Sequence, residues 1–171
     1  QPTAMPHTIY LDSNATTHVL PAAVDAATRA MCEQFGNPSS SHSDGLVAKA
    51  LLEQTRATAA QVLGAGDGQV VFTSGATEGI QTAVLSALRA NGPRREGQGG
   101  QLVVYGATEH KAVPHALEHW NSVLGLDLEI RALPVNADGQ HDLATLAAWL
   151  PGVALLCTMA ANNETGVVSN L

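Results

Sequence analysis

The 171-residue sequence has few positive charges and no long hydrophobic run. Its 8 lysines and arginines stand against 15 aspartates and glutamates, so the formal net charge is −7, and the acidic residues are scattered. Nucleic-acid-binding domains favour clustered basic residues, so we expect no nucleic-acid partner. No apolar run reaches the roughly 18 residues that a membrane-spanning helix needs, and no charged-then-apolar signal peptide is visible. We therefore expect no membrane partner either.

Cysteine is also scarce. Cys32 and Cys157 are too few for a disulfide framework, which predicts a reducing compartment, the cytoplasm. Cys32 lies in a helical pattern and Cys157 lies in an apolar run. We expect both side chains to be small buried hydrophobic groups.

What the sequence does contain is a regular alternation of strand and helix patterns. With 45% apolar and 13% charged residues, it has the composition of a globular domain or a piece of one. Strands are predicted over 8–12, 69–73, 101–105, 128–133 and 153–159. Helices are predicted over 21–35, 46–63, 76–90, 111–124 and 143–150, with Asp142 as the N-cap of the last and a polar loop over 91–100. This order predicts an α/β fold with a largely parallel sheet and helices on both faces. The unbroken apolar run 153–159 predicts a central strand that is covered on both sides.

Polar, chemically capable residues follow three of the predicted strands. They lie at Ser74–Thr77, at Gly106–His110 and at Ala161–Glu164. Ligand sites in parallel α/β sheets lie at the carboxyl ends of the strands. The sequence therefore predicts a site where these three segments meet.

The Ser74–Thr77 turn offers hydroxyls, little steric bulk and backbone N–H groups at a helix start, which suit a single phosphate. It lacks the Gly-Lys-Ser/Thr ending of a Walker A loop and the G-x-G-x-x-G pattern of a dinucleotide site. An ordinary strand-to-helix turn capped by Ser74 or Thr77 is the alternative interpretation. His110, at the start of the next helix, could cap that helix, stack on a flat ligand, or act as an acid or base.

A zinc site is a competing interpretation of the helix at 111–124. His115 and His119 stand in an H-x-x-E-H pattern, which occurs in zinc proteases. They lie roughly opposite the apolar stripe of Val113, Leu117, Trp120 and Leu124. We therefore expect both histidines to face solvent and predict no metal site.

Five ordered motifs resemble one known family: "YLDSNATT", "FGNPSSSH", "VVFTSGATEG", "TEHKAV" and "NNETGVV". Together they are similar to the N-terminal part of cysteine desulfurases of the NifS/IscS type. These are fold-type-I enzymes of the class V aminotransferase group that use pyridoxal 5′-phosphate (PLP). The resemblance runs from about Ile9 to Val168. It implies that residues 1–171 are the N-terminal half of the large PLP-binding domain.

The resemblance also implies roles for individual residues. Ala76 and Thr77 match the turn that binds the PLP phosphate. His110 matches the histidine that stacks on the pyridine ring and assists proton transfer. Asn163 matches the residue near the phenolic oxygen of PLP and the substrate carboxylate, and Asn14 and Ala15 match a turn near the mouth of the active site, in contact with substrate.

The residues that complete such a site are not among these 171. The two lysines, Lys49 and Lys111, do not match the family's PLP-tethering lysine, and neither cysteine matches its sulfur-accepting cysteine. The resemblance places both residues downstream of Leu171. We therefore expect a downstream C-terminal half, supplied by a second chain or absent through truncation; a stand-alone non-catalytic protein is the third alternative.

The implied reaction converts L-cysteine to L-alanine and leaves the sulfur on a protein cysteine as a persulfide. The resemblance further implies a homodimer, a sulfur-acceptor protein and a role in sulfur transfer such as iron–sulfur cluster assembly. Another class V enzyme, such as a selenocysteine lyase or an aminotransferase, is the alternative within the enzyme class. A non-catalytic assembly or binding subunit that keeps the fold is the alternative outside it.

Overall fold

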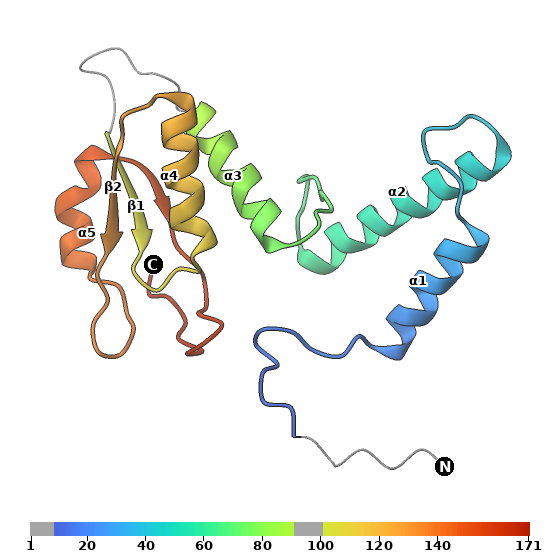
Figure 1. Cartoon of the computed structure of the whole chain (residues 1–171), viewed down its shortest axis with the longest axis horizontal. Coiled ribbons are helices and arrows are strands. Elements are labelled where there is room, and N and C mark those ends of the chain that lie inside the picture. Colours follow the sequence, from blue (N-terminus) through green and yellow to red (C-terminus); the bar gives the residue numbers. More distant parts are fainter. Residues whose placement is uncertain (1–8, 91–100) are drawn as a thin grey trace. The chain divides into compact units, whose positions relative to one another are not determined.

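A computed structural model describes residues 9–90 and 101–171, which belong to two units (Figure 1). Unit 1 is Gln1–Phe72 and unit 2 is Thr73–Leu171. None of the described helices is both long and apolar enough to cross a membrane.

Unit 1 contains two helices, α1 (Pro21–Glu33) and α2 (Ser43–Leu63), as the sequence predicts. Proline occupies the first turn of α1, where its missing N–H costs no helical hydrogen bond. α2 begins at Ser43, three residues earlier than predicted, and the imidazole of His42 accepts a hydrogen bond from the Gly45 N–H in its first turn. At its end Gly64 takes the left-handed conformation with φ of 63°, which glycine adopts without steric cost.

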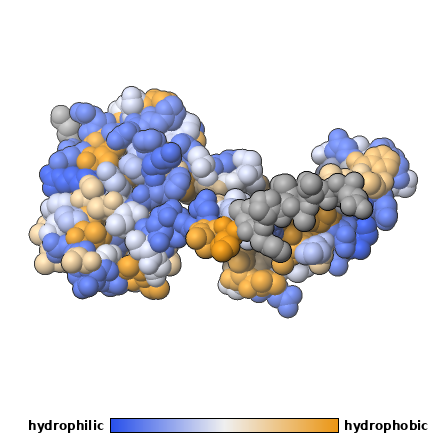
Figure 2. Space-filling model, turned by 60° about the horizontal axis from the view of Figure 1, so that its bottom comes forward, coloured by the Kyte–Doolittle hydropathy of each residue, from blue (hydrophilic) through white to orange (hydrophobic). Residues whose placement is uncertain are grey.

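Unit 1 leaves much apolar surface exposed, and on the face drawn in Figure 2 hydrophobic side chains gather in patches over it. No residue of α1 is buried, and α2 buries only Gly45 and Ala48. Cys32, on α1, is exposed, so the prediction that it is a buried hydrophobic group is wrong. The predicted helix is therefore present as α1, but none of its residues is buried.

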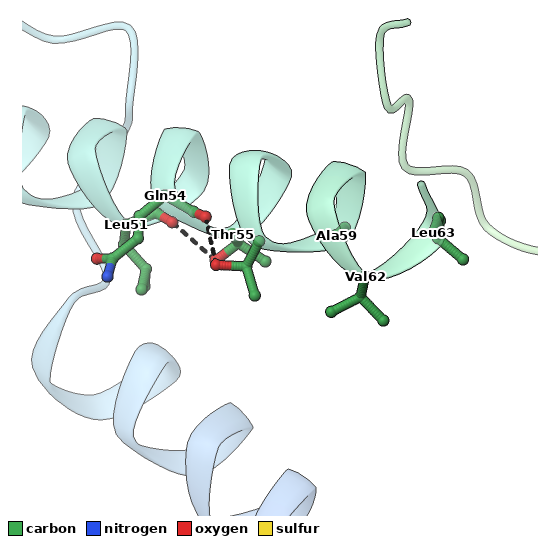
Figure 3. Close-up of a pocket in the computed structure, with 7 residues that line it drawn as sticks. Leu51, Gln54, Thr55, Ala59, Val62 and Leu63 are labelled. Carbon is green, nitrogen blue, oxygen red and sulfur yellow. Dashed lines mark hydrogen bonds between the residues drawn. The ribbon is translucent and has the colours of Figure 1, made fainter. Parts of the chain in front are cut away.

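One side of α2 forms a shallow groove (Figure 3), lined by Leu51, Gln54, Thr55, Thr58, Ala59, Val62 and Leu63. The hydroxyl of Thr55 donates to the Leu51 carbonyl at 2.7 Å, and that of Thr58 donates to the Gln54 carbonyl at 3.0 Å. These bonds satisfy the hydroxyls within the helix. The surface left to solvent is therefore mainly apolar.

Unit 2 is built on a parallel three-stranded sheet in the order β2-β1-β3. The strands are β1 (Leu102–Gly106), β2 (Glu129–Leu133) and β3 (Val153–Cys157), and the helices are α3 (Ala76–Ala90), α4 (Ala112–Leu124) and α5 (Leu143–Trp149), with a short 3₁₀ turn η1 (Leu150–Gly152) before β3. Figure 1 shows α4 on one side of the sheet and α5 on the other. The predicted parallel α/β fold with helices on both faces is confirmed.

Alternate residues of β1 enter two separate hydrophobic cores, because successive side chains of a strand point to opposite faces. Val103 packs with the apolar sides of α3 and α4, including Val84, Leu88 and Leu117. On the other face, the second core is formed by Leu102 and Val104 together with Leu133 of β2 and Leu146 of α5. Both faces of β1 are buried, so β1 is the central strand of the described sheet.

Two strand predictions are wrong and a third is correct only in part. Residues 9–12 and 69–73 form no strand, although both are rich in apolar residues. A strand requires the backbone of a partner, and within the described residues neither segment is paired; Val71 and Phe72 remain exposed. β3 ends at Cys157 and lies at an edge of the described sheet with half-buried residues, so it is not a central covered strand. Residue 8 and the predicted loop 91–100 lie outside the described residues.

Candidate functional site

The candidate site lies at the carboxyl end of the sheet in unit 2. In Figure 1 the strand arrows point toward the end of the unit at which α3 and α4 both begin. α3 and α4 are joined by a hydrogen bond of 2.6 Å from the Trp120 indole N–H to the Gln81 side-chain oxygen. The Ser74–Thr77 turn and His110 therefore stand at corresponding ends of two neighbouring helices, although the strand predicted before Ser74 is absent.

The turn before α3 already holds a carboxylate. The backbone N–H and the hydroxyl of Ser74 donate to the same oxygen of Glu78, at 2.7 and 2.6 Å. The bond from the hydroxyl and, to a smaller extent, the bond from the backbone N–H lower the pKa of Glu78. The turn is thus able to bind an anionic oxygen; in these bonds the Ser74 hydroxyl donates to a carboxylate and does not cap a helix N–H. Ala76 and Thr77 are the first residues of α3, where backbone N–H groups have no acceptor within the helix.

His110 is exposed at the start of α4. Its Nδ1 accepts a hydrogen bond of 3.2 Å from the Ala112 N–H, so it does cap the helix. A neutral imidazole that accepts at Nδ1 carries its proton on Nε2. The capping contact therefore leaves Nε2 as a donor toward solvent or a ligand.

Two side chains that sequence reasoning did not select join the loop after β1 to the loop after β3. The backbone N–H of Met159 donates a very short hydrogen bond to Oε1 of Glu109. The side-chain amide of Asn162 donates to the Thr108 carbonyl at 2.9 Å. Glu109 precedes His110 and Asn162 precedes Asn163, so the bridges stand directly beside two of the predicted site residues. A polar residue next to a candidate residue at a strand end is the signal that could have indicated them.

Asn163 is exposed, and its amide donates to the Glu164 carboxylate at 3.2 Å. Asn162 shapes the turn around it, because its Oδ1 accepts from the N–H groups of Glu164 and Thr165, both at 2.9 Å. The loop thus buries the first asparagine partly and presents the second to solvent. No described contact joins Asn163 to His110 directly.

Glu109 is partly buried and interacts electrostatically with His141 and Cys157. Burial raises the pKa of Glu109, against the opposing effects of the Met159 N–H and of His141. Burial and the nearby Glu109 carboxylate raise the pKa of the Cys157 thiol. A thiol with a raised pKa forms little thiolate, so Cys157 is poorly suited to act as a nucleophile.

His141 is the buried polar side chain of this region, with 6% of its surface exposed. Its backbone N–H donates to the Asn170 side-chain oxygen at 3.2 Å, whereas its Nδ1 is buried and has no hydrogen-bond partner in the described part of the chain. Nothing in the sequence indicated His141, because a histidine in a polar turn carries no periodic signal. The turn after β2 thereby joins the same end of the sheet.

Asn14 and Ala15 belong to unit 1, whereas the residues above belong to unit 2. The N–H of Ala15 donates to the Asp12 carbonyl at 3.1 Å and closes a turn. The Tyr10 hydroxyl donates to the carbonyls of Asp12 and Thr16, at 3.0 and 2.8 Å. The structure therefore shows an ordered turn at the predicted position. Its role toward substrate stays a prediction.

The zinc interpretation is not supported. His115 and His119 are exposed on α4, as the helix geometry predicts. The residues described by the structure contain no group of three or more side chains that could hold a metal ion.

Lys49 is exposed, and its amino group lies 3.9 Å from the carboxylate of Glu53 on the next helical turn, which makes a surface ion pair.

A family model described as aminotransferase class V matches residues 9–171. The chain belongs to this family. Among curated proteins, it is 41% identical over 162 residues to a cysteine desulfurase of Cereibacter sphaeroides. It is 39% identical over 162 residues to the cysteine desulfurase NifS of Azotobacter vinelandii. The predicted resemblance is thereby confirmed.

Solved structures of the family have the same fold. A NifS-like protein superimposes with a TM-score of 0.84 at 29% identity, covering 95% of this chain and 43% of that one. DndA of Streptomyces lividans superimposes with a TM-score of 0.70 at 34% identity, covering 95% and 44%. The two sequence relatives are covered over 40% and 38% of their length, with 94% of this chain aligned in both. The chain therefore spans about two fifths of its relatives.

Proposed function

We propose that this chain is the N-terminal part of a PLP-dependent cysteine desulfurase, which converts L-cysteine to L-alanine and passes the sulfur to a protein cysteine as a persulfide. The observation that carries the proposal is that the loop after β1 with His110 and the loop after β3 with Asn163 are joined in unit 2, within the residues that the class V family model matches. The turn before α3 lies within the same matched residues. The names of the relatives support the same reaction.

The residues present fit PLP. Ser74 already donates two hydrogen bonds to one carboxylate oxygen, which is evidence that the turn accepts an oxyanion. A phosphate would take that place, with the N–H groups of Ala76 and Thr77 as further donors and the helix dipole adding its field. The exposed His110 ring would cover the flat face of the cofactor, and the Asn163 amide would bond its phenolic oxygen without adding charge. When bound, PLP supplies the electron sink that stabilises a carbanion.

The chain's own side chains then have separate tasks in the proposed reaction. His110 carries a proton on Nε2 and can give or take one at the substrate, while its Nδ1 is held by the Ala112 N–H. Asn163 would bind the substrate carboxylate, and Asn14 and Ala15 would each contribute to substrate binding. Cys157 does not take the sulfur, because burial and Glu109 disfavour its thiolate.

The remaining parts of the proposal follow the resemblance. The tethering lysine and the sulfur-accepting cysteine would come from the C-terminal half that this chain does not contain. A homodimer, a sulfur-acceptor protein, a role in iron–sulfur cluster assembly and a cytoplasmic location belong to the same proposal. The low cysteine content is consistent with the last of these.

The test is to purify the complete polypeptide that carries this sequence, or this chain with its complementing half. The preparation should show the absorbance of protein-bound PLP and release one alanine per sulfur transferred from L-cysteine. Absence of PLP would contradict the proposal. Turnover of selenocysteine alone, or amino transfer to a keto acid, would instead support another class V reaction.

A further inference from the structure

Two side-chain hydrogen bonds join the loops that carry His110 and Asn163. One is the bond from the Met159 N–H to Glu109, and the other is the bond from the Asn162 amide to the Thr108 carbonyl. The joined residues are 50 and 54 positions apart in the chain. Each bridge starts one or two residues before a predicted site residue, so it fixes the backbone from which that side chain extends.

The two bridges differ in chemistry. The Glu109 carboxylate sits in a partly buried place, where His141 attracts it and burial disfavours its charge. Hydrogen bonds to charged acceptors in such surroundings are stronger than neutral ones. Asn162 is half-buried and uses both ends of its amide, since Nδ2 reaches Thr108 while Oδ1 holds the turn at Glu164 and Thr165.

The Glu109 side chain has room to reach Met159 because Gly106, the last residue of β1, has no side chain. A Cβ atom added at Gly106 would lie 2.6 Å from Cε1 of His141 and 3.5 Å from Oε1 of Glu109. A glycine at this position therefore lets both side chains approach the strand end. The turn after β2 carries His141. It is joined to the segment after β3 by a hydrogen bond of 3.1 Å from the Gln140 amide to the Val168 carbonyl.

We propose that Glu109 and Asn162 are positioning residues, which set the separation of His110 and Asn163 by clamping the loop after β1 to the loop after β3. Neither residue needs to touch substrate or cofactor. The proposal rests on the proposed function for its catalytic consequence. Its structural part, the clamp, is open to test without any ligand.

Four variants separate the clamp from general stability. Glu109→Ala removes the acceptor of the Met159 N–H, whereas Glu109→Gln keeps an acceptor oxygen of the same reach. Asn162→Asp keeps the Oδ1 acceptor of the turn but replaces the Nδ2 donor by an oxygen that faces the Thr108 carbonyl. Glu118→Ala, at an exposed site on α4, is the matched control.

Amide hydrogen exchange of the complete polypeptide, without cofactor or cysteine, tests the clamp. Glu109→Ala should speed exchange at Met159 about tenfold, because one net hydrogen bond protects this amide. Asn162→Asp should speed exchange across 159–165, while Glu109→Gln and Glu118→Ala should leave it near wild type. Unchanged exchange at Met159 in Glu109→Ala overturns the clamp.

The positioning role is tested on the PLP-loaded protein. Glu109→Ala and Asn162→Asp should lower kcat about tenfold or more with a smaller change in KM, and Glu109→Gln should restore most of the rate. Equal kcat in Glu109→Ala and wild type, despite faster exchange, overturns the role. A wild-type protein that binds no PLP is a different result, because it contradicts the proposed function while the exchange data still decide the clamp.

Discussion

The imidazole of His141 lies against the backbone of Gly106, so closely that a Cβ atom at Gly106 would stand 2.6 Å from Cε1 of the ring. Gly106 is the last residue of β1 and His141 belongs to the turn before α5. Both residues are buried. The contact therefore fixes how closely the turn after β2 approaches the carboxyl end of the central strand.

Gly106→Ala should destabilise the protein by about 1–3 kcal/mol, the usual cost of inserting a methyl group into a filled space. Chemical denaturation at neutral pH measures the change. Gly152→Ala is the control, because a Cβ there meets no atom within 4 Å. In a His141→Ala background the cost of Gly106→Ala should fall by at least half, and an undiminished cost would show that the ring is not what the methyl group meets.

Glu109 should make stability depend on pH in a known direction. Because burial raises its pKa in the folded state, the folded protein binds its proton more tightly than the unfolded chain does. The stabilisation from this group is complete below the ordinary glutamate range and is lost as the pH rises through the raised value. The free-energy difference between Glu109→Gln and wild type should therefore grow in favour of the variant over that interval and then level off. A difference that is constant with pH would contradict the direction.

Asp142 should make stability depend on pH in the opposite direction, so that stability falls in acid. Its carboxylate accepts from the Thr145 hydroxyl at 2.7 Å and from the Thr145 N–H at 3.0 Å, and these bonds lower its pKa. Its stabilisation of α5 is present at neutral pH and is lost as the pH falls through the lowered value. Asp142→Ala should lower the thermal midpoint at neutral pH. Asp142→Asn keeps a capping oxygen, so its thermal midpoint at neutral pH should stay close to that of wild type. The part of the fall in midpoint at acid pH that comes from Asp142 should be absent in this variant.

The sequence predicted the features that depend on neighbouring residues. The bounds of α3 and the N-cap of α5 were correct because helix periodicity and capping are local properties. The strand at 69–73 was not found, because a strand also needs a partner backbone that no local pattern supplies. The bridges from Glu109 and Asn162 span about fifty residues, so they became visible only when the sheet brought the two loops together.

Thr77→Val should weaken the binding of PLP through its phosphate by about tenfold, because it removes a hydroxyl next to the anion while keeping the shape of the side chain. Equilibrium titration with PLP, followed by absorbance, measures the change. Thr82→Val is the matched control on the same helix, since the Thr82 hydroxyl is already bonded to the Glu78 carbonyl at 2.9 Å. Equal weakening in both variants would place the effect in α3 as a whole rather than in the turn.

His110→Ala should leave PLP bound but slow the turnover of L-cysteine by about a hundredfold or more, the range that a lost general acid or base accounts for. The reason is the capping bond at Nδ1, which holds the ring and leaves Nε2 to exchange the proton. His110→Gln can still carry an acceptor near the Ala112 N–H but cannot exchange a proton at neutral pH. It should therefore restore the start of α4 without restoring the rate. If His110→Gln turned over cysteine at the wild-type rate, the histidine would serve only as a cap, and the proton would have to come from another group.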